Sequence, residues 1–136
     1  MVSARKTAVV TGASSGVGRA AAIELAGMGW NVICLGREPQ RSRDAEDAIR
    51  SAAAPDARVT MITGDLALLG DTARMADDVL GLGLPIHALC NNAGGVRSER
   101  LVTPEGNEAT FAGNHLGHFL LTRRLMPALV AAADAN

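Results

Sequence analysis

Apolar and polar positions along the chain follow two alternating patterns, which predict strands and helices in turn. Short apolar or β-branched runs, typical of buried strands, occupy residues 7–11, 31–35, 58–63 and 86–91. Helical spacing of apolar or charged residues predicts helices at 16–29, 39–53, 71–80 and 107–133. Glycine, proline and charged residues at 94–106 predict a loop, and Pro127 is expected to kink the last helix.

Strands that are apolar along their whole length are buried on both faces, so the alternation predicts a parallel sheet covered by helices. We therefore expect an α/β fold with a doubly wound, Rossmann-like parallel sheet, in a single domain over residues 1–136. In the dinucleotide-binding version the strand order begins 3-2-1-4, and the ligand lies beyond the carboxyl ends of strands 1 and 4. Cys34 and Cys90 would then lie about 9 to 10 Å apart across strand 1, too far for a disulfide.

Composition and charge narrow the classes of partner. The 136 residues carry 13 basic and 14 acidic side chains, and no dense Lys or Arg cluster indicates a nucleic-acid surface. No apolar run approaches the roughly 18 residues that cross a bilayer, and residues 1–6 are too short and polar for a signal peptide, so we expect a cytoplasmic protein. The two cysteines lie in apolar runs, which predicts buried, reduced thiols and no metal site.

The segment TGASSGVG, residues 11–18, joins the first strand to the first helix. Glycine at such a turn lets a pyrophosphate approach the backbone, and the free N–H groups and dipole of the helix favour its negative charge. The motif predicts a phosphate site formed by Gly12, Ser14, Ser15, Gly16, Val17 and Gly18. A tight turn that needs positive φ is the alternative, although it explains one glycine more readily than three.

Three further motifs follow in order: Gly64-Asp65-Leu66 after the third strand, NNAG at 91–94 after the fourth, and NHLGHFLLT at 114–122. With the glycine motif they resemble the short-chain dehydrogenase/reductase family, in the subclass with the spacing TGxxxGxG. The resemblance runs from Thr7 to about Ala133. The last motif, preceded by TPEG, is most similar to the branch that contains retinol dehydrogenases and related reductases of apolar carbonyl compounds.

The resemblance implies roles for residues at the ends of strands 3 and 4. It implies that Asp65 accepts a hydrogen bond from the adenine amino group, that Leu66 supplies a backbone contact, and that the nicotinamide-ribose side is lined by Asn92, Ala93 and Gly94. Each motif also has a plainer interpretation, since Asp65 could cap the next turn and the asparagines could form an ordinary turn.

Asn114 lies in an otherwise apolar predicted helix, where a buried amide needs hydrogen-bond partners. The resemblance implies that it is the Asn of the catalytic tetrad, which holds a water in the proton relay. His115 and His118 are expected to be structural, because two histidines three residues apart with no further ligand nearby do not indicate a metal site.

The end of the second strand predicts the cofactor. An acid about 20 residues past the glycines binds the ribose 2′-hydroxyl of NAD, whereas an Arg accommodates the 2′-phosphate of NADP. Here the sequence is Leu35-Gly36-Arg37, and Arg37 suits bidentate phosphate contact. Glu38 would repel a phosphate if it faced inward, but at a helix start we expect it to face solvent. NADP is therefore favoured over NAD.

The chain also departs from the family pattern. Family members transfer a hydride from the nicotinamide, with a Tyr supplying the proton, a Lys four residues on lowering the pKa of that Tyr, and a Ser polarising the carbonyl. This sequence contains no tyrosine and only one lysine, Lys6, before the first strand. Of the tetrad only Asn114 is present, so we expect the domain to be incomplete at its C-terminus and truncated before strand 5.

Two classes of protein stay open. The first is the cofactor-binding part of an NADP-dependent oxidoreductase acting on a small apolar carbonyl or alcohol, and the second is a non-catalytic dinucleotide-binding module with a sensing or scaffolding role. Strand 4 would leave an apolar sheet edge unpaired, which favours the first class. The Ala- and Leu-rich segment 116–133 resembles the helix that the family uses in its dimers, so self-association is expected.

Overall fold

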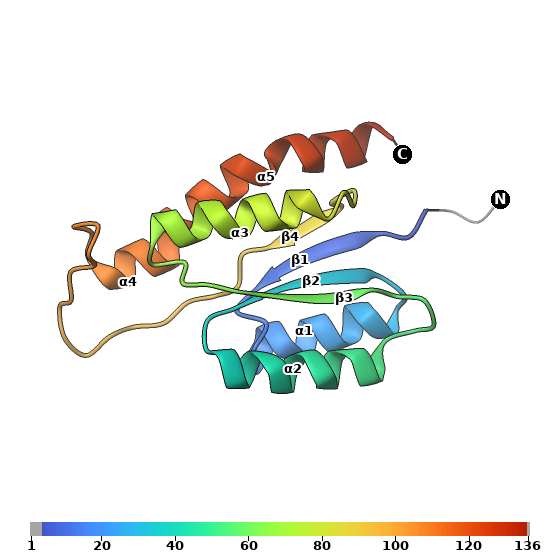
Figure 1. Cartoon of the computed structure of the whole chain (residues 1–136), viewed down its shortest axis with the longest axis horizontal. Helices are drawn as coiled ribbons and strands as arrows, with labels where there is room; N and C mark the ends of the chain where they lie inside the picture. Colours follow the sequence, from blue (N-terminus) through green and yellow to red (C-terminus); the bar gives the residue numbers. More distant parts are fainter. Residues whose placement is uncertain (1–3, 136) are drawn as a thin grey trace.

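The computed structural model describes residues 4–135, which form a parallel sheet between two layers of helices (Figure 1). In chain order the elements are β1 (Thr7–Thr11), α1 (Gly16–Gly27), β2 (Asn31–Gly36), α2 (Pro39–Ala52), β3 (Val59–Thr63), α3 (Leu69–Gly81), β4 (Ala88–Cys90), α4 (Ala109–Phe111), the π-helical turn η1 (Ala112–Leu116) and α5 (Gly117–Asp134).

The strand order is β3-β2-β1-β4 with all neighbours parallel, which confirms the predicted doubly wound fold. Val10 pairs with Cys34 on one side and with Cys90 on the other, so a whole strand separates the two thiols. Adjacent strands lie about 4.8 Å apart, so the cysteines are beyond the reach of a disulfide, and both are free.

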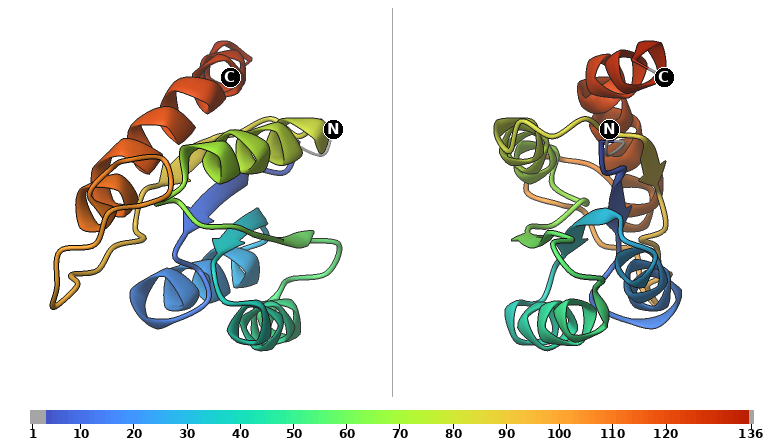
Figure 2. Two further views of the ribbon diagram at one scale, coloured as in Figure 1. Left: turned by 60° about the vertical axis from the view of Figure 1, so that its left-hand side comes forward. Right: turned by 90° about the vertical axis from the view of Figure 1, so that its right-hand side faces the viewer.

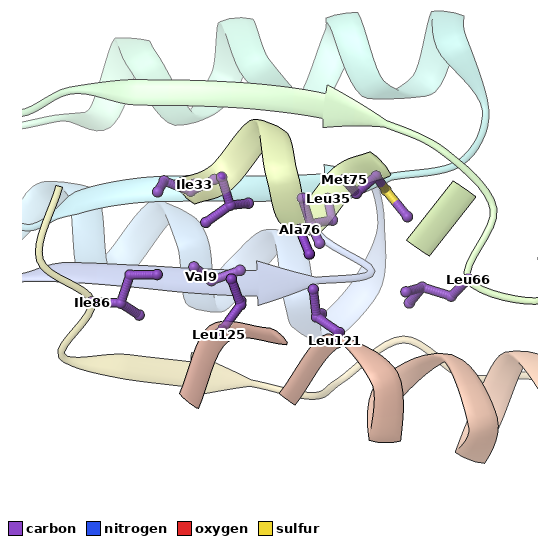
Figure 3. Packing of buried hydrophobic residues seen from close by; sticks show 10 residues of the cluster. Val9, Ile33, Leu35, Leu66, Met75, Ala76, Ile86, Leu121 and Leu125 are labelled. Atoms are coloured by element: carbon purple, nitrogen blue, oxygen red, sulfur yellow. The ribbon is translucent and has the colours of Figure 1, made fainter. Parts of the chain in front are cut away.

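Alternate residues of the strands pack against the two helical layers. Helices α1 and α2 cover one face of the sheet and α3 and α5 the other (Figures 1 and 2). On the α3 and α5 side, Val9 and Ile33 meet Met75, Leu121 and Leu125 in one buried cluster (Figure 3). A second cluster fills the other side, where Val10, Cys34 and Val32 contact residues of α1 and α2. Because successive side chains of a strand point to opposite faces of the sheet, each central strand contributes residues to both clusters.

The expectation of complete strand burial holds only for the centre of the sheet. Every residue of β1 and β2 is buried, whereas β3 and β4 are largely half-buried because each forms an edge. The fourth strand is also shorter than predicted, with three residues, Ala88–Cys90, in place of 86–91. Ile86 is nevertheless fully buried in the core.

The predicted long helix at 107–133 is interrupted. It begins at Ala109, where the Glu108 side chain caps the first turn, and it passes through the π-helical turn η1 before α5 begins at Gly117. Gly117 lies against the backbone of Leu66, so closely that a Cβ would overlap the Leu66 carbonyl oxygen. Pro127 lies inside α5, where the expected kink stays a prediction, and the change from α-helical to π-helical bonding occurs at Ala112–Leu116.

Candidate functional site

A hollow of about 600 Å³ opens at the carboxyl ends of the strands, where the predicted motifs meet. Its walls come from the turn after β1, the start of α2, the segment after β3, the segment after β4, and η1. All the residues predicted to bind cofactor line it except Gly18, and Asn114 lines it too. The lining residues among those predictions are Gly12, Ser14, Ser15, Gly16, Val17, Arg37, Asp65, Leu66, Asn92, Ala93 and Gly94.

The structure gives a different physical reason for glycine at each of the three positions of the first turn. Gly12 has φ +66°, and a Cβ there would lie 2.8 Å from the Cα of Ala93. Gly18 has no room for a Cβ beside the Gly12 carbonyl and the Asn92 amide. Gly16 has φ +55° and open space around the position of a Cβ. Contacts within the chain already require glycine at 12 and 18, whereas at Gly16 the positive φ favours glycine and the space beside it is open.

The N-terminus of α1 faces the hollow without a side-chain acceptor. Ser15 is the N-cap residue of α1 but makes no capping hydrogen bond, and no acidic residue lies in the first turn. The starts of α2, α3 and α4 differ, because Glu38 caps α2, Glu105 accepts from Leu69 N and Gly70 N at α3, and Glu108 caps α4. Uncapped N–H groups and the helix dipole together favour an anion at α1.

Thr11 at the end of β1 holds the segment after β4, a role that sequence analysis missed. Its hydroxyl oxygen accepts hydrogen bonds from the backbone N–H groups of Asn92 and Ala93, both at 2.9 Å. The Asn92 side chain donates to the Thr11 carbonyl at 3.2 Å. These bonds join the TG and NNAG motifs, and the strictly local pattern around Thr11 carried no signal of a partner 81 residues away.

Asn114 is exposed, which corrects the expectation of an amide inside an apolar helix. Its Oδ1 accepts from the Gly95 N–H at 3.0 Å, and its Nδ2 donates to the Gly95 carbonyl at 2.9 Å. The amide therefore closes a two-bond clamp on the residue after NNAG, and the π-helical turn places it there.

Asp65 takes part in the local turn. Its Oδ1 accepts from the Ala67 N–H at 2.9 Å, and its own N–H donates to Asp71 Oδ2 at 2.9 Å. The plainer interpretation of Asp65 as a turn residue thus applies, and the side chain also lines the hollow.

Three charged residues line the hollow beyond β2. Glu38 turns its carboxylate to α2, accepting from Gln40 N at 3.0 Å and Arg41 N at 2.6 Å. The hydrogen bond from the Arg41 N–H, followed by that from the Gln40 N–H, lowers the pKa of Glu38 below its ordinary value. Arg37 and Arg41 both line the hollow and are exposed. Sequence analysis missed Arg41, although its position in the first turn of a helix that starts at Pro39 was a usable signal.

The histidines lie outside the hollow. His115 stacks on Phe111 with ring centroids 5.2 Å apart, and His118 is buried. Within residues 4–135, no three His, Cys, Asp or Glu side chains gather in a way that could hold a metal ion. In the same part of the chain no helix is both long and apolar enough to cross a membrane.

A family profile and two curated proteins match the sequence of this chain over most of its length. The profile of the short chain dehydrogenase family matches residues 6–136. The chain is 41% identical to mouse polyprenol dehydrogenase over 127 residues, covering 93% of this chain and 38% of that protein. It is 38% identical to human retinol dehydrogenase 13 over 131 residues, covering 96% of this chain and 39% of that protein.

A solved structure of a metagenomic short-chain oxidoreductase in complex with NADP matches with a TM-score of 0.77 and 33% identity, over 93% of this chain and 57% of that one. The chain spans about two fifths of the length of polyprenol dehydrogenase and of retinol dehydrogenase 13. Because the family profile covers nearly every residue and the fold matches that of a solved short-chain oxidoreductase, the chain belongs to the short-chain dehydrogenase family.

Proposed function

We propose that the hollow binds NADP and that these residues form the cofactor-binding part of an oxidoreductase that interconverts a carbonyl and an alcohol. The observation that carries the choice of NADP is the arrangement beyond β2. Arg37 and Arg41 line the hollow together, while the acid between them in the sequence, Glu38, directs its carboxylate to the N-terminus of α2. A 2′-phosphate there would lie beside two arginines, and the carboxylate of Glu38 is already engaged by backbone N–H groups.

The remainder of the hollow suits the other parts of a dinucleotide. The uncapped start of α1 and the open side of Gly16 offer backbone N–H groups to a pyrophosphate. Asp65 keeps one carboxylate oxygen free of the Ala67 bond, which leaves an acceptor for the adenine amino group. Asn92, Ala93 and Gly94 would then border the nicotinamide ribose. When bound, the cofactor supplies a hydride.

A binding experiment tests this proposal directly. The chain is titrated with NADPH and NADH, and binding is followed by the fluorescence of the reduced nicotinamide. NADPH is expected to bind at least tenfold more tightly, because only it carries the 2′-phosphate. Equal affinity for the two would contradict the choice of NADP, and no affinity for either would contradict a dinucleotide site.

The names of two relatives support a proposal for the substrate class. Polyprenol dehydrogenase and retinol dehydrogenase 13 are named for apolar alcohols, and we propose a small apolar alcohol or carbonyl for the whole protein. The non-catalytic module stays as the alternative, because the 136 residues hold no tyrosine. Co-expression with a relative's C-terminal half that carries Ser and Tyr-x-x-x-Lys separates the two, since only the first proposal expects NADPH oxidation, and a Tyr→Phe change in that half should remove it.

We also propose self-association through the helical layer that ends the chain. Phe111 and Phe119 are 52% and 60% exposed, and Met126 and Val130 follow them along α5 at 45% and 50%. These four side chains are spaced along one continuous helical segment, and exposed apolar stripes of this kind mark protein interfaces. Sedimentation velocity tests the proposal, since a monomer at micromolar concentration would contradict it, and Phe119→Ser is expected to shift the equilibrium to monomer.

A further inference from the structure

His118, in the first turn of α5, is buried but connects two parts of the candidate site. Only 7% of the residue is exposed. Its Nε2 lies 2.8 Å from the Thr11 hydroxyl oxygen, and its Nδ1 lies 3.0 Å from the carbonyl oxygen of Asn114. The ring does not line the hollow. The ring therefore connects the end of β1 to the π-helical turn without lining the hollow itself.

The hydrogen bonds determine which ring nitrogen carries the proton. A carbonyl oxygen only accepts, so Nδ1 must donate to Asn114. The Thr11 hydroxyl oxygen has two lone pairs, and the N–H groups of Asn92 and Ala93 occupy both at 2.9 Å. Its single hydrogen is thus free to be donated to Nε2 at 2.8 Å, a shorter contact than the alternative acceptor, the Cys90 carbonyl at 3.3 Å. Every donor and acceptor is then satisfied by a neutral ring with hydrogen on Nδ1.

This chain of bonds surrounds the NNAG segment on two sides. Thr11 holds Asn92 and Ala93 through their N–H groups, and the Asn114 side chain clamps Gly95. His118 bonds to the Thr11 hydroxyl and to the backbone carbonyl of Asn114, so the end of β1 and the π-helical turn cannot separate without breaking one of these two hydrogen bonds. Between these attachments lie Ala93 and Gly94, which belong to the side of the hollow assigned above to the nicotinamide ribose.

We infer that His118 is a positioning residue, which acts through Thr11 and Asn114 to fix the NNAG wall of the cofactor site. The inference rests on the proposed NADP function for its consequence, since its effect is on the nicotinamide half of the ligand. The adenine half would lie beside Arg37, Arg41 and Asp65, which none of these bonds involves.

The test compares two ligands on the full chain. His118→Phe fills the space of the ring but removes both nitrogens. NADPH affinity is expected to fall about three- to tenfold, the scale of one or two net hydrogen bonds, while adenosine 2′,5′-bisphosphate, which lacks the nicotinamide half, binds as before. His118→Asn, which places an amide N–H near the Nδ1 position, is expected to restore part of the loss. His115→Phe, an exposed change three residues away, is the matched control and should alter neither affinity.

The outcomes are separable. An equal loss for both ligands would show a general packing role and overturn the inference, as would unchanged NADPH affinity. A separate result would contradict the proposed function alone. It is an unaltered chain that binds NADPH and NADH with equal affinity. A second readout needs no cofactor, because nitrogen NMR of the imidazole should show His118 protonated at Nδ1 and bare at Nε2. The opposite tautomer would contradict the bond assignment.

Discussion

Gly18 in α1 lies so close to Gly12 that a Cβ on Gly18 would overlap the Gly12 carbonyl oxygen and come within 2.5 Å of the Asn92 side-chain nitrogen. The first turn of α1 is therefore pressed against the end of β1 and the start of the NNAG segment. This contact fixes where the uncapped N–H groups of α1 lie relative to the hollow. Gly16, two residues earlier, has the opposite environment, because nothing lies within 4 Å of a Cβ built there.

We expect Gly18→Ala and Gly16→Ala to fail in different ways. Gly18→Ala should lower the free energy of unfolding by about 1–3 kcal/mol because it overpacks a contact between backbones. Gly16→Ala should cost only about 1–2 kcal/mol for its left-handed backbone, yet its methyl group enters the space proposed for pyrophosphate. Urea unfolding and NADPH titration of both variants measure the two effects.

Gly83 provides the control for Gly16. It also has a positive φ, +66°, and open space around a Cβ, but it does not line the hollow. Gly83→Ala is expected to destabilise the chain about as much as Gly16→Ala and to leave NADPH affinity unchanged. An equal loss of affinity in both variants would mean that backbone strain, and not ligand space, is the cause.

The sequence was sufficient to predict the arrangement of the strands and the edge of the sheet at which the site lies. The alternation of apolar runs and helical segments predicted a parallel α/β sheet, and the order 3-2-1-4 was that of the dinucleotide-binding version of this fold. The same patterns placed Asp65, Asn92 and Arg37 at one edge of the sheet, where they now line a single hollow. Strand ends are the most predictable part of such a fold, since each strand brings its last residues to the same edge.

Other parts of the site depend on contacts that no local pattern contains. The π-helical turn at Asn114 occurs in a segment whose spacing predicts a regular helix, and the clamp on Gly95 needs that turn. The hydroxyl of Thr11 meets Asn92 only when β1 and β4 are paired. Glu38 was correctly expected at a helix start, but its two capping hydrogen bonds follow from a geometry that the sequence does not state.

Arg37→Ala is expected to weaken NADPH binding by roughly 1.5 to 3 kcal/mol, the scale of a hydrogen bond to a charged group, and to leave NADH nearly unaffected. Arg41→Ala should show the same selectivity, because Arg41 lines the same part of the hollow. Isothermal titration with both cofactors measures the difference.

Arg43 is the matched control for these two arginines. It lies on α2 and donates to the Gln40 side chain at 2.7 Å, outside the lining of the hollow. Arg43→Ala should change neither affinity. Equal losses for NADPH and NADH in Arg37→Ala would argue that Arg37 supports the fold and does not select the cofactor.

Ser42→Ala is expected to stabilise the chain by about 1 kcal/mol, because an unsatisfied buried hydroxyl costs roughly 1–3 kcal/mol. Ser42 is fully buried in α2, and its hydroxyl has no hydrogen-bond partner within the described residues. Thermal unfolding should show a midpoint about 4 °C higher. Ser51→Ala is the control, since Ser51 is exposed and bonds to the Asp47 carbonyl. A lower midpoint for Ser42→Ala would mean that its packing against Gly36 outweighs the missing bond.

The stability of the chain should fall above about pH 9 through Cys34. Burial, with a smaller contribution from the charge of Glu46, raises the pKa of this thiol to about 12 from 9.0. Between these values the unfolded chain loses the thiol proton while the folded chain keeps it. Rising pH therefore favours unfolding, by at most about 1.4 kcal/mol per pH unit. Urea midpoints at several pH values, compared with Cys34→Ala, measure this; an identical pH dependence in the variant would contradict it.

The chain with these 136 residues is expected to bind NADPH without reducing a carbonyl compound. General acid catalysis needs a group placed to give up a proton, typically worth about 10²- to 10⁴-fold in rate. None of the three histidines is so placed: His87 accepts from the Thr7 N–H at the opposite end of the sheet, His115 lies between Phe111 and Phe119, and His118 is buried behind the NNAG segment.

The single lysine is no better placed as a donor. Lys6 lies 5.7 Å from the ring centre of Trp30, away from the hollow. The measurement is NADPH oxidation with an apolar aldehyde as substrate, followed against protein concentration. A rate that follows protein concentration and disappears in Asn114→Ala would contradict the prediction. It would also require a proton donor close to the Asn114 side of the hollow, where the described lining residues offer backbone groups, amides, the Thr110 hydroxyl and the Arg97 side chain.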